Sequence, residues 1–222
     1  PPTTTTEPPT TPTAPPPSGG FGAPEVALGH RLGGAYVVER APAGAGMTYR
    51  RAAMANLSLG LLETASAYGE RPALRQGDLV LTYAELDDIT ARATAMLRVR
   101  GMSPGDRVGI MMPNRVAFPI IYYGILRAGG VVVPMNPLLK SREVAFYLDD
   151  CGAKVIFVFE DFAEEASKGA AATGAECVVV TPDWLQATLA ETHPDPDVAE
   201  RDGADTVLIL YTSGTTGKPK GA

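Results

Sequence analysis

Cysteine occurs only twice in this sequence, as Cys151 and Cys177. Two thiols do not form a disulfide framework, and their spacing is not that of a metal site. We therefore expect two buried structural thiols in a reducing compartment. Histidine is equally scarce, because His30 and His193 are the only two. Neither has a nucleophile or metal ligand near it in sequence, so we expect both to be solvated.

Long hydrophobic runs and an excess of positive charge are also missing. The most apolar stretch, residues 108–135, is interrupted by prolines, an asparagine and arginines, so it lacks the ~18 apolar residues of a membrane span. The N-terminus does not have the basic and apolar regions of a secretory signal. The formal net charge of −6 gives no basic surface for nucleic acid. We expect a cytoplasmic protein without a transmembrane segment. The sequence leaves open whether the protein contacts a membrane peripherally.

The N-terminal part of the chain has little that could form a core. Residues 1–17 are almost entirely proline and threonine, and glycine and alanine dominate the stretch that follows. This composition predicts an extended or disordered segment. The chain does not begin with methionine, and periodic sequence begins only after Met54. We therefore divide the chain into a leader at residues 1–53 and a folded part at residues 54–222.

In the folded part, amphipathic helices alternate with continuous apolar strands. Apolar residues spaced by three or four predict the helices, and uninterrupted apolar runs predict strands buried on both faces. This alternation indicates a doubly wound α/β fold, with a mainly parallel sheet covered by helices on both faces. Ligands of such sheets bind at the carboxyl ends of the strands. Helices are expected at residues 55–68, after Thr82, at 116–128, from Ser141, at 162–172 and from Trp184, and strands at 107–112, 131–134, 154–159, 177–180 and 206–211.

Local signals predict where several of these elements begin and end. Gly77, followed by aspartate, predicts the turn of a hairpin over residues 72–83. Thr82 and Glu85 have the spacing of a capping box at a helix start. Gly101 stands where a left-handed helix end is expected.

Charged residues near two of the helices are interpreted as surface groups. Arg115 and Arg127 flank an apolar helix, for which Asn114 is the expected cap, and we expect both arginines at the surface. Asp149 and Asp150 close another helix, and we interpret them as a solvated helix end rather than an acid–base pair.

The segment with the most groups that could bind a ligand follows the last expected strand and reads TSGTTGKPKG. Its glycines let the backbone approach a ligand and take positive φ angles. Hydroxyl and backbone N–H groups can donate to phosphate oxygens, and two lysines supply positive charge. The segment therefore predicts a polyphosphate site. The expected binding residues are Thr212, Ser213, Gly214, Thr215, Thr216, Gly217, Lys218, Lys220 and Gly221.

The spacing of this loop excludes a Walker A motif. That motif has four residues between its glycines and a Ser or Thr directly after the lysine. Here two residues separate Gly214 from Gly217, and Pro219 follows Lys218. The proline also argues against a helix that continues from the loop. A kinase or NTPase is therefore the weaker interpretation.

The eleven residues YTSGTTGKPKG resemble the phosphate-binding signature of the AMP-forming, or adenylate-forming, ligases. The blocks LTYAEL at 81–86 and ILRAGG onward at 125–157 resemble two further blocks of the family, in the same order. The resemblance covers roughly residues 57–222. Within the second block, VPMNPLLK is more similar to the acyl-CoA synthetase branch, particularly fatty-acid CoA ligases, than to peptide-synthetase adenylation domains.

The resemblance implies a ligase that uses ATP, Mg²⁺ and, as co-substrate, CoA. A carboxylate, here a fatty acid, attacks the α-phosphorus of ATP to give an acyl-adenylate and pyrophosphate. A thiol of CoA or of a carrier protein then displaces AMP. The loop would hold the β- and γ-phosphates, and Lys218 and Lys220 would offset their charge. The metal ligands stay open, with the Thr215 hydroxyl as one candidate near magnesium.

The same resemblance implies that no catalytic residue of the family maps onto this sequence. The adenine-binding segment, the magnesium-binding acid and the catalytic lysine lie downstream of the loop in the family, and the strand that returns from the loop is also expected beyond Ala222. We therefore expect the 222-residue chain alone to be inactive. Two alternatives stay open: a non-catalytic interaction module whose leader recruits a partner, and another adenylate-forming enzyme such as a peptide-synthetase adenylation domain.

Overall fold

The protein is described here from a computed structural model, which describes residues 56–212 and 219–222. All of these residues belong to one compact unit, Val38–Ala222. The leader predicted at residues 1–53 lies outside the described residues, and its boundary with the folded part stays a prediction.

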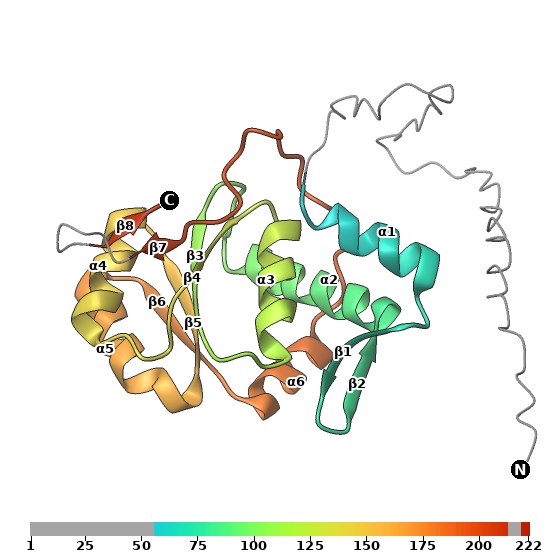
Figure 1. Ribbon diagram of the computed structural model, residues 1–222, viewed down its shortest axis with the longest axis horizontal. Helices are drawn as coiled ribbons and strands as arrows, with labels where there is room; N and C mark the ends of the chain where they lie inside the picture. The colour runs from blue at the N-terminus through green and yellow to red at the C-terminus, as the bar shows by residue number, and fades with distance from the viewer. Residues whose placement is uncertain (1–55, 213–218) are drawn as a thin grey trace, which may run out of the picture. The chain divides into compact units, whose positions relative to one another are not determined.

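Four parallel strands form the central sheet (Figure 1). They are β3 (Arg107–Met111), β4 (Val131–Pro134), β5 (Val155–Phe159) and β6 (Glu176–Val180), in the spatial order β4-β3-β5-β6. The chain begins in the middle at β3, adds β4 on one side and then crosses to the other side for β5 and β6. The order in which strands are added therefore reverses between β3 and β5. Open α/β sheets bind ligands at such a point.

One face of the sheet packs against three helices. These are α2 (Tyr83–Val99), α3 (Ala117–Arg127) and α6 (Pro182–Glu191). Ile110 and Phe157 on this face are fully buried in the same apolar cluster as residues of all three helices. The remaining elements on this side are α1 (Leu59–Tyr68) and the hairpin of β1 (Pro72–Gln76) and β2 (Leu79–Thr82).

The opposite face packs against α4 (Ser141–Cys151) and α5 (Ala163–Thr173), which follows the short 3₁₀ helix η1 (Glu160–Phe162). Met111 and Ile156 are buried in this second cluster. Alternate strand residues point to opposite faces, and both sets are apolar here, so both faces need a cover. The prediction of a doubly wound α/β fold is confirmed (Figure 1).

The predicted capping box forms at the start of α2. The Thr82 hydroxyl accepts from the Glu85 N–H at 3.3 Å, and the Glu85 carboxylate accepts from the Thr82 N–H at 2.8 Å. The hydrogen bond from Thr82 also lowers the pKa of Glu85. At the other end of the helix, Gly101 has a φ of +80°, as a left-handed helix end requires. Gly77 has a φ of +59° in the hairpin turn.

Replacing Thr82 by alanine is expected to lower the free energy of unfolding by about 1 kcal/mol, because an orphan N–H at the start of α2 loses its acceptor. Urea denaturation of the chain measures this loss. Thr64→Ala is the matched control, since Thr64 lies inside α1 and alanine favours a helix interior. An equal loss in both variants would rule out a specific capping contribution.

Two helix starts differ from the prediction. Asn114 does not cap α3, which begins at Ala117. Instead, the side-chain oxygen of Gln76 in β1 accepts from the Val116 N–H at 2.8 Å. Helix α6 begins before Trp184, because Thr181 caps it by accepting from the Trp184 N–H at 3.0 Å.

The prediction that Arg127 lies at the surface is wrong. Its side chain is buried, and it donates to the Asp87 carboxylate at 2.6 Å and to the Pro196 carbonyl at 3.0 Å. The arginine thereby links the end of α3 to α2 and to the segment before residue 200. Arg115, in contrast, is exposed as predicted, with its guanidinium over the Phe159 ring.

The structure describes both cysteines and one of the two histidines. Cys151 and Cys177 are free thiols, as predicted, but each is only half-buried. Burial raises the pKa of the Cys151 thiol. His193 is exposed, as predicted, and His30 lies outside the described residues.

The expected strand at residues 206–211 is mostly not a strand. Only Leu208 forms a bridge, parallel to Val132 of β4. The chain then continues into β7 (Tyr211–Thr212), which pairs with β8 (Lys220–Gly221) in a separate antiparallel sheet. The strand that returns from the loop is therefore present, and the expectation that it lies beyond Ala222 is wrong.

None of the helices in residues 56–212 and 219–222 is long and apolar enough to cross a membrane.

Candidate functional site

The predicted phosphate loop is carried by the β7–β8 hairpin. Tyr211 pairs with Gly221 and Thr212 with Lys220. Beyond these pairs, Leu210 and Ala222 exchange two backbone hydrogen bonds of 2.9 Å. Both ends of the loop are thus held together. Of the predicted binding residues, Ser213, Gly214, Thr215, Thr216, Gly217 and Lys218 lie outside the described residues.

A strand, rather than a helix, follows the loop. Lys220 and Gly221 are extended and paired directly after Pro219. The loop is therefore not backed by a helix N-terminus, which P-loop nucleotide sites use to bind phosphate. This agrees with the expectation drawn from Pro219.

Thr212 and Lys220 present polar groups at the base of the loop. The two residues are direct partners across the hairpin, and side chains of such partners lie on the same face. Both are exposed, and Lys220 forms no ion pair with any of the residues that the structure describes. An ammonium and a hydroxyl on one face suit an anionic ligand.

Gly221 is required by packing and not by its backbone angle. Its φ does not lie in the left-handed region. A Cβ here would lie 2.9 Å from Cγ2 of Ile209 and 3.2 Å from the ring of Tyr211. The absence of a side chain lets the Tyr211 ring pack directly on β8.

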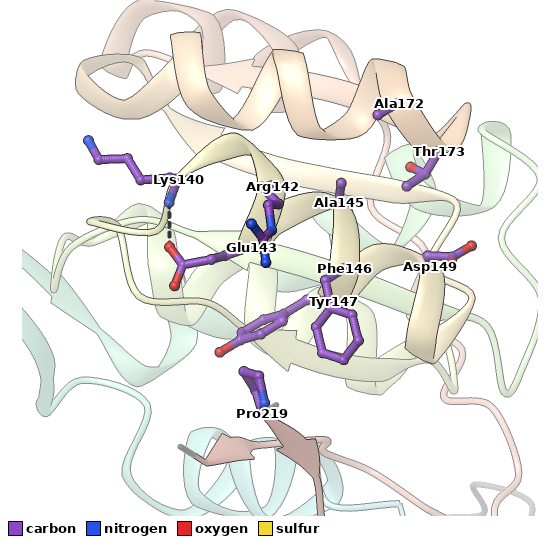
Figure 2. A pocket seen from close by; sticks show the side chains of 10 residues that line it. All are labelled: Lys140, Arg142, Glu143, Ala145, Phe146, Tyr147, Asp149, Ala172, Thr173 and Pro219. Carbon is purple, nitrogen blue, oxygen red and sulfur yellow. Dashed lines mark hydrogen bonds between the residues drawn. The ribbon is translucent and has the colours of Figure 1, made fainter. Parts of the chain in front are cut away.

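A cavity of about 820 Å³ lies beside this hairpin (Figure 2). The rings of Phe146 and Tyr147 on α4 face Pro219 at the end of the loop. Two cations and two acids also border the cavity, so its charge is mixed. The lining residues are Lys140, Arg142, Glu143, Ala145, Phe146, Tyr147, Asp149, Ala172, Thr173 and Pro219.

The sequence profile of the family described as AMP-binding enzyme matches residues 61–222, which is most of the chain. The chain belongs to this family. Both parts of the site described above, the hairpin and the α4 side of the cavity, fall within the matched residues.

Individual relatives agree with this assignment. Long-chain-fatty-acid–CoA ligase FadD13 of Mycobacterium tuberculosis is 38% identical over 149 residues, which are 65% of this chain and 29% of the relative. A linear gramicidin synthase of Brevibacillus parabrevis is 34% identical over 160 residues, covering 72% of this chain and 3% of the relative. The solved structure of ATP-bound MatB from Rhodopseudomonas palustris matches with a TM-score of 0.69 and 29% identity, over 76% of this chain and 34% of that chain.

The chain spans about a third or less of the length of these relatives. The matches to CoA ligases support the acyl-CoA synthetase branch of the AMP-binding enzymes, as the sequence block after residue 130 indicated.

A second cavity, of about 680 Å³, lies at the carboxyl ends of the central strands. Phe159 and Val180 are the last residues of β5 and β6, and Arg115 follows β3; all three line it. Its other walls are mostly apolar side chains of α2, α3, α6 and the β1–β2 hairpin. Its place agrees with the ligand position expected for a sheet of this topology.

The described residues contain no cluster of side chains that could bind a metal ion. Within residues 56–212 and 219–222, no three His, Cys, Asp or Glu side chains are grouped so that they could hold a metal ion. Thr215, the candidate near magnesium, lies outside these residues.

Sequence reasoning found the loop but missed its support on α4. Tyr147 and Asp150 contact Tyr211 from more than 60 positions away in sequence. The apolar stripe of α4 indicated only core packing, so no local signal pointed to this contact.

Proposed function

We propose that this chain supplies the phosphate-binding part of an ATP-dependent, AMP-forming acid–thiol ligase that converts a fatty acid to its acyl-CoA thioester. The observation that carries the proposal is the β7–β8 hairpin. It sets Lys220, which forms no ion pair with the described residues, opposite Thr212 at the base of a loop with the family's phosphate signature. The similarity to a protein named long-chain-fatty-acid–CoA ligase supports the choice of acid and acceptor.

The described residues at the base of the loop suit the phosphates of a nucleoside triphosphate. Lys220 is exposed, and Thr212 offers a hydroxyl beside it. Mg²⁺ binds through oxygen ligands, which usually include waters and the phosphates of the substrate. The metal ion would neutralise charge on the phosphates, and the Thr215 hydroxyl is the group of this chain that we propose near it.

The chemistry assigned to this chain is the departure of pyrophosphate. In the first half-reaction, a carboxylate oxygen bonds to the α-phosphorus, and the bond to the bridging β-phosphate oxygen breaks. Negative charge then grows on the leaving pyrophosphate, and the ammonium groups of Lys218 and Lys220 would stabilise it. Contacts that strengthen as this charge develops raise the rate, whereas equal binding of substrate and transition state does not. In the second half-reaction, the thiol sulfur attacks the acyl carbon and AMP leaves.

Product analysis tests this function. The protein as its gene encodes it is incubated with Mg²⁺-ATP, a long-chain fatty acid and CoA. We expect AMP, pyrophosphate and acyl-CoA in equal amounts, and no AMP when the acid is omitted. Formation of ADP and phosphate would favour a kinase or NTPase and contradict the proposal.

A second function is favoured by one observation, the 34% identity to a linear gramicidin synthase. In that case the acid would be an amino acid and the acceptor a carrier-protein thiol. The same assay with a mixture of amino acids in place of the fatty acid separates the two. AMP formation only with amino acids would favour this alternative.

A further inference from the structure

Tyr211, the first residue of β7, contacts helix α4 through both its ring and its hydroxyl. Its ring stacks on the ring of Tyr147, with centroids 4.0 Å apart and an angle of 15° between the planes. Its hydroxyl donates to Oδ2 of Asp150 at 2.6 Å. We call Tyr147, Asp150 and Tyr211 the tyrosine clamp. It joins the α4 side of the molecule to the strand that leads into the loop.

The clamp also packs against β8. Gly221 lies under the Tyr211 ring, so closely that a Cβ would come within 3.2 Å of it. Backbone hydrogen bonds between Leu210 and Ala222 hold the same two strands together. Lys220 therefore lies on the strand against which the Tyr211 ring packs.

Helix α4 is a rigid support for this contact. Tyr147 is 9% exposed, and its helix neighbours Val144 and Leu148 are buried. Val144 packs closely on α5, because a Cβ added at Gly169 would lie 2.7 Å from the Cβ of Val144. A side chain held between such elements keeps its geometry, which is what a binding group needs from its supporting residues.

We propose that Tyr211 is a positioning residue, which through Tyr147 and Asp150 places Thr212 and Lys220 to bind the phosphates of ATP. The proposal rests on the function proposed above. Tyr211 itself need not touch the nucleotide, because its ring and hydroxyl are engaged by α4. Burial, together with the hydrogen bond to Asp150, raises the pKa of Tyr211, so its hydroxyl stays a donor throughout the physiological range.

Steady-state kinetics of the protein as its gene encodes it test the clamp. Tyr211→Phe removes the hydroxyl and keeps the stacked ring, and Asp150→Ala removes the acceptor. We expect each to raise KM for ATP about fivefold, since each removes the 2.6 Å hydrogen bond between Tyr211 and Asp150, which is much shorter than the 3.5 Å contact of the Tyr211 hydroxyl with the Tyr147 carbonyl. KM for the carboxylic acid and the thermal unfolding midpoint should not change. Asp150→Asn keeps an acceptor oxygen and should restore nearly the wild-type KM.

The matched control is Tyr68→Phe, the same chemical change on an exposed tyrosine of α1. We expect it to leave KM for ATP unchanged. The double variant Tyr211→Phe/Asp150→Ala should also show only about a fivefold rise, because the two changes remove one shared contact. Fold-changes that multiply would show that the residues act independently, and would overturn the proposal.

The outcomes also separate this proposal from the proposed function. An unmodified protein that neither binds ATP nor forms AMP would overturn both. An active protein whose Tyr211→Phe variant behaves like Tyr68→Phe would overturn the positioning role alone. A variant that loses thermal stability and affinity for every substrate together would show a structural role instead.

Discussion

Replacing Arg127 by alanine is expected to lower the free energy of unfolding by about 3 kcal/mol. The arginine is 2% exposed and donates to the Asp87 carboxylate and the Pro196 carbonyl. Breaking a buried ion pair from one side costs roughly 3–5 kcal/mol, because the remaining partner is left unpaired. Asp87 is about one-third exposed, so we take the lower end of this range. Urea denaturation of the chain gives the value.

Lys168→Ala is the control for this substitution. Lys168 forms an ion pair at 2.6 Å with Glu164, but both side chains are largely exposed on α5. Such pairs contribute no more than about 0.5 kcal/mol. A loss for Arg127→Ala as small as that for Lys168→Ala would contradict the structural role that we assign to the buried arginine.

Replacing Lys220 by alanine is expected to lower kcat/KM for ATP about 100-fold, the effect of removing one charge-stabilising group from a transition state. Lys220 is exposed and forms no ion pair with the described residues, so its loss should leave the unfolding midpoint unchanged. Pyrophosphate release from ATP in the presence of a fatty acid is the measurement.

Lys154→Ala is the matched control for that experiment. The Lys154 side chain is 79% exposed, just before β5 and outside the hairpin, and its one ion pair with the described residues is a 3.8 Å contact to Asp106. We expect near wild-type kinetics from this variant. If Lys220→Ala and Lys154→Ala reduce the rate equally, the hairpin does not bind the phosphates in the way proposed.

The sequence predicted most of the fold because each element carries its own signal. Strands β3 to β6 are continuous apolar runs, and both faces of the sheet are in fact covered. The capping box of Thr82 and Glu85 spans only three positions, so it could be read directly. Local patterns of this kind predict the structure correctly because they do not depend on a distant partner.

The errors concern contacts between distant parts of the chain. Arg127 is buried because Asp87 and Pro196, 40 and 69 positions away, supply its acceptors. Asn114 does not cap α3, and the Val116 N–H at its start instead donates to Gln76, which lies 40 positions earlier. No pattern in the sequence around these residues indicates such partners.

The candidate site divides in the same way. The residues of the loop were predicted from the motif, and Thr212 and Lys220 do lie on one face of the hairpin. The support from Tyr147 and Asp150 was not predicted, and Asp150 is more than a solvated helix end because it accepts from Tyr211. Sequence therefore identified the groups proposed to bind phosphate, and the structure was needed to find what holds them.

If the β7–β8 hairpin holds the phosphates that leave as pyrophosphate, the first half-reaction must be reversible at this site. The most direct measurement is exchange of labelled pyrophosphate into ATP by the protein as its gene encodes it, with a fatty acid present and CoA absent. We predict exchange that requires the acid, persists in Lys154→Ala and falls about 100-fold in Lys220→Ala. Exchange that is absent with every carboxylic acid, or that is unaffected by Lys220→Ala, would contradict a role of this hairpin in AMP-forming ligation.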